Sequence, residues 1–586
     1  MKSLILSLAI AVAVLLGATG VIFAESATWN LNPTTGDWNT AINWMPNTVP
    51  NGTDDIATFG VSNVTDVTQS TTTILGGMQF EPGANSYNIN VLPGNDFRFN
   101  DAGVTNDSGV TQSITCSSGN VHFSNRSTAG ENVLYTNTST DTSFGSYITF
   151  QDSATAGSAT FIGTGLPPFA SAGVLFVNTS SAGSSHITAN GVPGNGGLGF
   201  VEFDDDSTAA ESSITFANAA QGLFYSPAGA ANSTLTCSLS SLFFLGSSSA
   251  GAATINCSDG SILSFSSSAT AATATINSSG STGNFLDFAT AGAATITWTG
   301  LSVVFDDHAT AGAATFTADG ATLHFQGQSD GGTARIILAN ASTLLADHER
   351  RGPVFHLGSL EGEGTATINR AFVIGGNNLD ATFSGNLEST SEGDWLTKVG
   401  TGTWTLAGTG SYPGSTTVTA GTLVVTSAST PTGSGPVNVN AGTLGGSGII
   451  AGAVTVGTGG GAAAFLAPAH GGNKQLTLTI QDSLTFNSKG TYTYTFKAKR
   501  NKSKIDKVIA NGVTINSGAS INLSGTTQGH LTQGTVLTLI KNTAATPIAG
   551  AFSNLPDGGI VNVNGNNLQA SYEGGDGNDL TLTVVP

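Results

Sequence analysis

Cysteine and charged residues are both scarce in this chain of 586 residues. Three cysteines are too few for a disulfide framework in so long a polypeptide. Charged residues make up 9% of the sequence, and 37 Asp and Glu against 17 Lys and Arg give a net charge of −20. That balance disfavours nucleic acid and anionic membranes as general partners. Stability must therefore come from packing and from backbone hydrogen bonds.

Helical periodicity is also missing outside the first 24 residues. Residues 1–24 combine Lys2 with the apolar run LILSLAIAVAVLLGATGVIFA, which is the pattern of a secretory signal peptide with cleavage near Ala24 or Ser26. No Cys follows the run, so a lipoprotein anchor is not supported, and no later apolar run is long enough for a membrane helix. We therefore expect an exported protein, at the cell surface or extracellular, with the periplasm as an alternative.

What the chain does contain is Gly and Phe, together with a repeat. With 78 Gly, 30 Phe and 39% hydrophobic residues, it has too much apolar material for a disordered chain. Residues 289–308, ATAGAATITWTGLSVVFDDH, are followed at once by ATAGAATFTADGATLHFQGQ at 309–328. A period of this size predicts a solenoid in which each turn covers the core of its neighbour. Aligned units start at Ala269, Ala289, Ala309 and Ser329.

Within each unit the apolar residues alternate with polar ones, which is typical of a strand with one buried face. Ala294 and Ile296 flank Thr295, a turn follows at Gly280, Gly300, Gly320 or Asn340, and a second strand ends in Phe285, Phe305, Phe325 or Leu345. Because like residues recur at one interval, equivalent strands should stack in parallel. Parallel crossovers are almost always right-handed. The predicted fold is therefore all-β, a right-handed parallel β-helix (β-solenoid).

Five segments follow from this pattern. The signal peptide (1–24) precedes an N-terminal cap and first turns (25–100), with Trp29, Trp38 and Trp44 closing one end. A solenoid of 20 to 27-residue repeats covers 101–350, a different strand repeat covers 351–460, and the last turns and a C-terminal cap cover 461–586. Caps are expected because an open parallel edge recruits other chains.

The strand repeat carries a family resemblance. From Trp395 the chain reads WLTKVGTGTWTLAGTGSYPGSTTVTAGTLVV, which closely resembles the passenger-associated strand repeat of bacterial autotransporters. GDWNTAINW near the N-terminus and FSNLPDGGIVNVNGNNLQASYEGGDGNDLTLTV at the end are similar to other parts of such passengers. The resemblance implies export across a Gram-negative envelope and a surface β-helix, often an adhesin. Autotransporters place a translocator barrel after the passenger, whereas this chain stops at Pro586, so we expect a protein that is periplasmic, released, or carried by a separate translocator.

A recurrent aspartate is the main candidate for chemistry. Asp152, Asp205, Asp287, Asp307 and Asp347 precede the Thr-Ala hallmark or its equivalent, and FDDH and LADHER add His308, His348, Glu349 and Arg350. Stacked carboxylates could supply the separation of roughly 5 to 9.5 Å that glycoside hydrolysis needs, with Asp287, Asp307, His308, Asp347 and Arg350 as the catalytic candidates. The alternative, which we favour, is that Asp recurs because the turn recurs.

Two smaller motifs each have a functional and a structural interpretation. GGDGND at 574–579 offers Asp576 and Asp579 as calcium ligands, but a single copy supplies too few oxygens, and a capping turn is favoured. Cys237 and Cys257 should lie one above the other, either as a disulfide or as small core residues, and the core interpretation is favoured. Cys116 has no partner by this logic.

Basic residues concentrate in one segment, FKAKRNKSKIDK at 496–507. Lys497, Lys499, Arg500, Lys502 and Lys504 could dock an anionic polysaccharide or a lipid head group, although a solvated hairpin is the expected structure. Taken together, the sequence predicts an exported, passenger-like protein with a structural or adhesive role, no catalysis and no cofactor. An extracellular glycan or a cell-surface protein is the expected partner. The alternative is a polysaccharide-binding or polysaccharide-cleaving β-helix that uses the aspartates at 287 to 347.

Overall fold

The computed structural model describes residues 25–139, 145–168, 170–194, 196–347, 354–389, 396–470, 474–499, 502–527 and 530–586. The predicted signal peptide lies outside them. The chain divides into two compact units, Met1–Ser241 and Leu242–Pro586. Each is built of β-strands, and the described residues include one short 3-10 helix, η1 (Ala41–Asn43). No helix among the described residues is long and apolar enough to cross a membrane.

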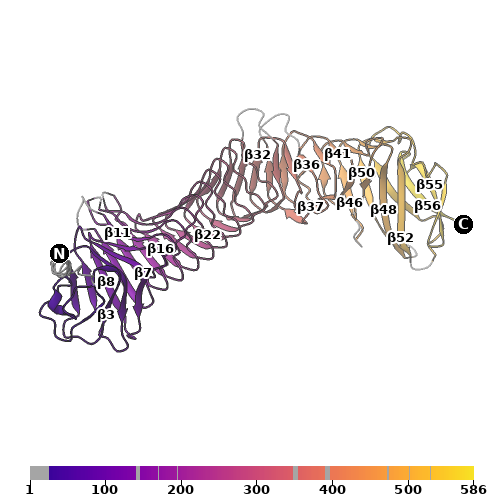
Figure 1. The fold of residues 1–586 in the computed structure, drawn as a ribbon. Coiled ribbons are helices and arrows are strands. Elements are labelled where there is room, and N and C mark those ends of the chain that lie inside the picture. The colour runs from indigo at the N-terminus through magenta and orange to yellow at the C-terminus, as the bar shows by residue number, and fades with distance from the viewer. Residues whose placement is uncertain are drawn as a thin grey trace, which may run out of the picture. The chain divides into compact units, whose positions relative to one another are not determined.

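The N-terminal unit stacks its turns through two parallel sheets, which confirms the predicted all-β solenoid (Figure 1). Strands of the first sheet are β6 (Asn88–Val91), β8 (Gln112–Ser117), β10 (Val133–Thr138), β12 (Thr160–Thr164), β14 (His186–Asn190), β16 (Ser213–Ala217) and β18 (Thr234–Ser238). Strands of the second are β7 (Asp96–Asn106), β9 (Asn120–Phe123), β11 (Ser146–Phe150), β13 (Ala172–Phe176), β15 (Gly199–Phe203) and β17 (Gln221–Phe224). Alternate residues are buried in strands such as β12 and β15, so such a strand gives one face to the core.

Aromatic residues close the first turns of this unit. β1 (Ala27–Trp29) pairs antiparallel with β2 (Trp44–Met45) and parallel with β3 (Gly52–Phe59). Trp29, Trp38 and Trp44 are buried, with the Trp38 and Trp44 ring centroids 4.7 Å apart. Because β1 and β2 cover the edge with an antiparallel pair, the stack does not present an open parallel strand there.

The C-terminal unit begins with the most regular repeats. β20 (Thr254–Ser258), β22 (Thr275–Ser279), β24 (Thr295–Thr299), β26 (Thr315–Asp319) and β28 (Arg335–Ala339) form one sheet, and β21 (Ile262–Phe265), β23 (Thr282–Phe285), β25 (Ser302–Phe305), β27 (Thr322–Phe325) and β29 (Thr343–Ala346) form the next. Phe305 pairs with Phe325 in register, and their ring centroids lie 4.7 Å apart. Like residues therefore stack on like residues, as the period predicts.

Register changes by one residue at the last of these repeats. Three residues separate β28 from β29, whereas two separate β26 from β27, and Phe325 consequently pairs with Ala346. The prediction that Leu345 continues the phenylalanine column was wrong, because the turn at Asn340 carries one extra residue and moves Ala346 into the core position. The left-handed turn itself is present, with φ of 51° at Asn340.

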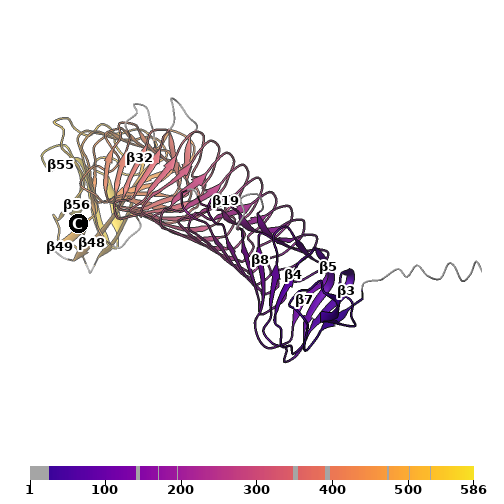
Figure 2. The same ribbon diagram turned by 90° about the vertical axis from the view of Figure 1, so that its left-hand side faces the viewer.

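Beyond this point a third parallel sheet runs along the unit. Its strands are β30 (Phe355–Leu357), β33 (Phe372–Ile374), β36 (Leu396–Lys398), β39 (Thr416–Val418), β41 (Val437–Val439), β44 (Val454–Val456), β47 (Leu484–Phe486) and β51 (Val513–Ile515). Alongside it run β31 (Ser359–Gly362), β34 (Ala381–Phe383), β37 (Thr403–Leu406), β40 (Thr422–Val425), β42 (Gly442–Gly446), β45 (Ala464–Leu466), β48 (Gly490–Lys499) and β52 (Ser520–Thr527). Figure 2 shows these stacked turns from a second direction.

Antiparallel strands end this unit. β53 (Val536–Asn542) pairs parallel with β50 (Lys507–Ala510) and antiparallel with β56 (Asp579–Val585). β56 in turn pairs with β55 (Asn566–Gly574), which pairs with β54 (Ile560–Val563). The change of direction ends the parallel stack.

Candidate binding surfaces

The turn aspartates lie singly at exposed turns of left-handed backbone. Asp287 has φ of 60°, and its carboxylate accepts a hydrogen bond of 2.9 Å from the backbone N–H of Ser267 in the preceding turn of the solenoid. Asp152 and Asp205 do the same, accepting from Asn125 at 2.9 Å and Asn178 at 3.1 Å. These carboxylates tie one turn to the next.

Asp307 occupies the same kind of turn, with φ of 54°, and its own backbone N–H donates to the Asp306 carboxylate at 2.7 Å. The candidate His308 stacks on Phe288, with ring centroids 4.9 Å apart, and both side chains are exposed. His348, Glu349 and Arg350 lie outside the described residues.

Asp347 belongs to a different column from Asp287 and Asp307. The extra residue after β28 places Asp347 in register with Gln326, so its assignment to the turn column was wrong. Its carboxylate lies 3.1 Å from Nε2 of His324 and accepts from Nδ2 of Asn369 at 3.0 Å. Within the described part of the chain, no three His, Cys, Asp or Glu side chains gather as a metal site would require.

The GGDGND segment forms a hairpin turn in which its two aspartates have different surroundings. Gly574 pairs with Asp579, and the Asp579 carboxylate accepts the backbone N–H of Asn542 at 2.9 Å. Burial raises the pKa of Asp579 despite that hydrogen bond. Asp576 lies exposed at the turn. Asp579 therefore ties the hairpin to β53.

The cysteines are core residues. Cys116, Cys237 and Cys257 are all buried, and Cys257 is a free thiol, so the alternative of a disulfide between Cys237 and Cys257 is not formed. Burial raises the pKa of Cys116 to about 12, which makes its thiol a poor nucleophile.

The basic segment forms a hairpin between β48 and β49 (Lys502–Ile505). Lys497 pairs with Lys504, and Lys499 with Lys502, across antiparallel strands. Arg500 and the side chains of Lys499 and Lys502 lie outside the described residues. Like charges directly opposite each other are destabilising, so this pairing does not by itself favour the hairpin.

A pocket of about 340 Å³ lies at the base of this hairpin, which we call the hairpin pocket. Residues of β48 and β52 form one wall, and His470 and Gln475 lie in the other. Its lining residues are Ala467, Ala469, His470, Gln475, Thr493, Thr495, Phe496, Lys497, Asp506, Ser524, Gly525 and Thr526. No sequence motif indicated this cavity, because its two walls come from segments that pair only in the folded chain.

Asp506 lies beneath the pocket and is fully buried. Its Oδ1 accepts the N–H of Leu476 at 2.9 Å, and its Oδ2 accepts the N–H and the hydroxyl of Thr495 at 2.9 and 2.6 Å. Burial outweighs these hydrogen bonds and raises the pKa of Asp506. Asp506 therefore fixes the two walls of the pocket relative to each other.

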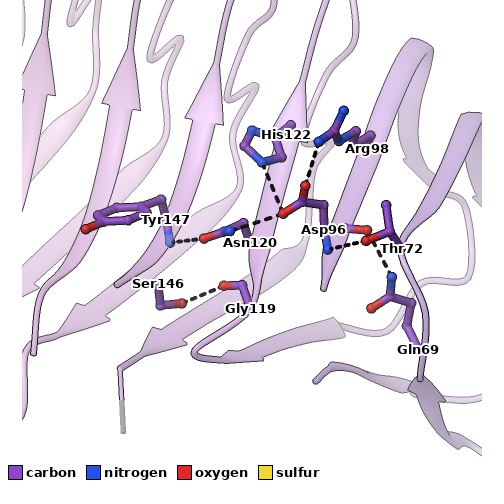
Figure 3. A network of polar contacts seen from close by, with 9 residues as sticks. All are labelled: Gln69, Thr72, Asp96, Arg98, Gly119, Asn120, His122, Ser146 and Tyr147. Atoms are coloured by element: carbon purple, nitrogen blue, oxygen red, sulfur yellow. Dashed lines mark hydrogen bonds and ion pairs between the residues drawn. The ribbon is translucent and has the colours of Figure 1, made fainter. Parts of the chain in front are cut away.

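In the N-terminal unit, a polar network crosses the solvent side of β7, β9 and β11 (Figure 3). Asp96 accepts from Arg98 at 2.6 Å and from Asn120 at 3.1 Å, and His122 lies 3.7 Å away. Asn120 also accepts the backbone N–H of Tyr147 at 3.0 Å. Partial burial raises the pKa of Asp96, but the hydrogen bonds from Arg98 and Asn120 outweigh it and leave the pKa below its usual value.

An aromatic pair continues this face along the stack. Tyr147 pairs across β11 and β13 with Gly173, which pairs with Phe200 on β15. A Cβ at Gly173 would lie 2.4 Å from the Phe200 ring, so the ring rests on this glycine, and its centroid is 6.1 Å from that of Tyr147. Both rings are half-buried on the outward side. We call Tyr147, Gly173 and Phe200 the aromatic platform.

A shallow groove of about 550 Å³ follows the stacked turns of the same unit. Small and polar residues line it, including Thr128, Gly130, Glu131, Gly157, Ser158, Gly183 and Ser184, with residues 104–107 at one end. The N-terminal unit thus presents polar and half-exposed aromatic surface on several turns.

Two comparisons with known proteins give matches. The family model described as Passenger-associated-transport-repeat matches residues 396–425. Among solved structures, the crystal structure of the Haemophilus influenzae Hap adhesin is similar, with 12% identity and a TM-score of 0.26 over 92% of this chain and 65% of that chain. The match thus takes in about 65% of the Hap chain. No curated protein matches. The matched repeat and the parallel solenoid that contains it fit an autotransporter passenger domain.

Proposed function

We propose that this chain is an exported structural or adhesive module that acts at the cell surface or outside the cell without catalysis. Passenger domains of this class are exported, which supports the location. One observation supports the adhesive role: outward-facing threonines lie in register on successive strands of the sheet. Thr275, Thr295 and Thr315 pair in sequence across β22, β24 and β26 and are exposed or half-exposed.

Such a column supports binding through many weak contacts. Each hydroxyl both donates and accepts hydrogen bonds, and repeating it at every turn lets an extended glycan or protein surface engage several sites at once. The absence of catalysis is supported by the turn aspartates, because Asp287 is occupied with a backbone N–H and Asp347 lies in another column.

The experiment compares adhesion by two matched variants of the mature chain, coupled to beads and applied to cells and to a glycan panel. Thr295→Glu with Thr315→Glu places two charges on the outward column. Ala293→Glu with Ala313→Glu places the same charges on exposed turn positions of the same two repeats. Adhesion should fall several-fold for the threonine pair and stay unchanged for the alanine pair.

Equal adhesion by both variants would contradict a role for the column. Polysaccharide cleavage by the purified chain that is lost in Asp287→Asn with Asp307→Asn would contradict the proposed absence of catalysis.

A further inference from the structure

We infer that the hairpin pocket binds a carboxylate-bearing sugar unit, such as a uronate residue of an anionic polysaccharide. This inference rests on the proposed adhesive function and names a partner class for one site. A volume of about 340 Å³ is at the lower end of the range for small-ligand pockets, which suits one sugar unit and its immediate neighbours.

Charge gives the first reason for an acidic ligand. The chain carries a net charge of −20, and the segment 496–507 holds six of its seventeen basic residues. Lys497 lines the pocket and pairs across the hairpin with Lys504, and His470 lies at the exposed edge. A charged donor such as Lys497 makes the stronger kind of hydrogen bond to a carboxylate.

Hydroxyl groups give the reason for a sugar. Thr493 and Thr495 on β48 alternate with buried residues, and Ser524 and Thr526 are exposed on β52. Thr495 pairs with Ser524 and Lys497 with Thr526, so the hydroxyls form a patch next to the cation. Neutral hydroxyls that donate and accept suit sugar hydroxyls, whereas a simple anion would use only the lysine and histidine.

Asp506 sets the orientation of the ligand. Its carboxylate takes three hydrogen bonds from the protein and is buried, so it is not open to the ligand. Its charge repels a second carboxylate, which places the acid group of the ligand at the Lys497 end of the pocket, since His470 lies near Asp506. Thr495 donates its proton to Asp506 and its oxygen accepts from Nε2 of Gln475 at 3.4 Å, which leaves one lone pair of that oxygen to accept from a sugar hydroxyl. Asp506 is thus a positioning residue.

Calorimetric titration of the full mature chain tests this assignment. The probes are glucuronate and galacturonate, the matched neutral sugars glucose and galactose, and inorganic phosphate. We expect the uronates to bind at least tenfold more tightly than the neutral sugars and than phosphate. Lys497→Gln should weaken uronate binding about tenfold or more and leave the neutral sugars unchanged, because a charged hydrogen bond is lost.

Two further variants make the result specific. Thr526→Val should weaken uronates and neutral sugars alike, since it removes a hydroxyl and no charge. Lys541→Gln, on an exposed lysine of β53 outside the pocket, should change nothing. Circular dichroism and hydrogen exchange over β48 and β52 establish that each variant is folded.

Three results would overturn the inference: equal affinity for uronates and neutral sugars, tighter binding of phosphate, or unchanged uronate affinity in Lys497→Gln. Bead adhesion of the same variant separates this inference from the proposed function. If uronate binding fails and adhesion persists, the adhesive role stands and this pocket is not its site. If uronate binds and no adhesion is found, the pocket stands and the proposed function is wrong.

Discussion

Two stretches of the C-terminal unit fill the same kind of core in opposite ways. From Phe244 to Phe325 the core column is a stack of phenylalanines, with successive ring centroids 4.6 to 4.9 Å apart. The matched repeat at 396–425 buries unlike residues instead: Leu396, Lys398, Trp404, Leu406, Tyr412 and Val418. In the first stretch the repeated sequence places identical side chains on each other, so the core packs the same way at every turn. In the second stretch each buried residue makes its own particular contacts.

Hydrogen bonds within the second stretch show those roles. Trp404 donates its indole N–H to the carbonyl of Leu360 at 3.1 Å, and the Tyr412 and Thr416 hydroxyls lie 2.6 Å apart. The Lys398 ammonium donates to the carbonyls of Val399 and Gly400 at 2.6 and 3.2 Å.

Gly421 has a specific place beside Lys398. Lys398 also donates to the carbonyl of Ala420 at 3.4 Å, and a Cβ at Gly421 would lie 2.5 and 2.6 Å from the carbonyl oxygens of Gly400 and Gly402 and 2.9 Å from the ammonium nitrogen. A side chain there would crowd the lysine, and φ of 63° favours glycine as well. A polar core of this kind needs particular residues at particular positions, which explains why its sequence is recognisable as a family repeat.

The largest effect is expected from breaking the phenylalanine stack. Phe305→Ala removes a fully buried ring that contacts a ring on each side, and it should lower the free energy of unfolding by about 3–5 kcal/mol. Because a solenoid turn contacts mainly its neighbours, hydrogen exchange should rise in β23, β25 and β27 and stay unchanged in β41 and β44. Phe288→Ala, at 64% exposure, is the control and should change stability by under about 0.5 kcal/mol. Exchange that rises evenly across the unit would show that the stack is not a local source of stability.

A smaller effect on the free energy of unfolding should come from the titration of Lys398 with pH. Burial lowers the pKa of Lys398 from 10.5 to about 8. Between these values the unfolded chain holds a proton that the folded chain has released, so the free energy of unfolding should rise with pH, by at most about 3 kcal/mol in all. Buried tyrosines act in the other direction above about pH 10, because burial raises their pKa, to about 12 for Tyr87 and Tyr572. The window for measurement is therefore about pH 8 to 10.

Denaturant titrations at several pH values, monitored at Trp404, measure the slope of the free energy of unfolding against pH. Lys398→Met should remove the slope, whereas Lys541→Met, which removes an exposed lysine, should keep it. A Lys398→Met chain with an unchanged slope would show that the titrating group lies elsewhere.

The same comparison explains what could be predicted from the sequence. The strand faces, the turn glycines and the contact of Phe305 with Phe325 follow from the period alone, because each copy meets an identical neighbour. The prediction failed at Leu345 and Asp347, where one extra residue near Asn340 moved the register. A fixed period of twenty residues cannot locate such an insertion. Either Leu345 or Ala346 could take the core position until the strand pairing is known.

The candidate binding surfaces could not be predicted from the sequence, for a related reason. The hairpin pocket joins His470 to Lys497, and the aromatic platform joins Tyr147 to Phe200 across a glycine. These partners lie in turns of unequal length, so no fixed spacing relates them. The basic hairpin was visible because its residues are consecutive.

The smallest effect separates two turn aspartates that look alike in the sequence. Asp287→Ala and Asp307→Ala both place alanine at positive φ, so the strain of the left-handed turn is shared. The Asp287 carboxylate accepts the Ser267 N–H, whereas the hydrogen bond at the Asp307 turn is donated by its own backbone to Asp306. Asp287→Ala should therefore cost about 0.5–1 kcal/mol more than Asp307→Ala, with faster exchange of the Ser267 amide in the first variant alone. Equal cost and equal exchange would mean that these aspartates recur for their backbone preference and that the bond between turns adds nothing to stability.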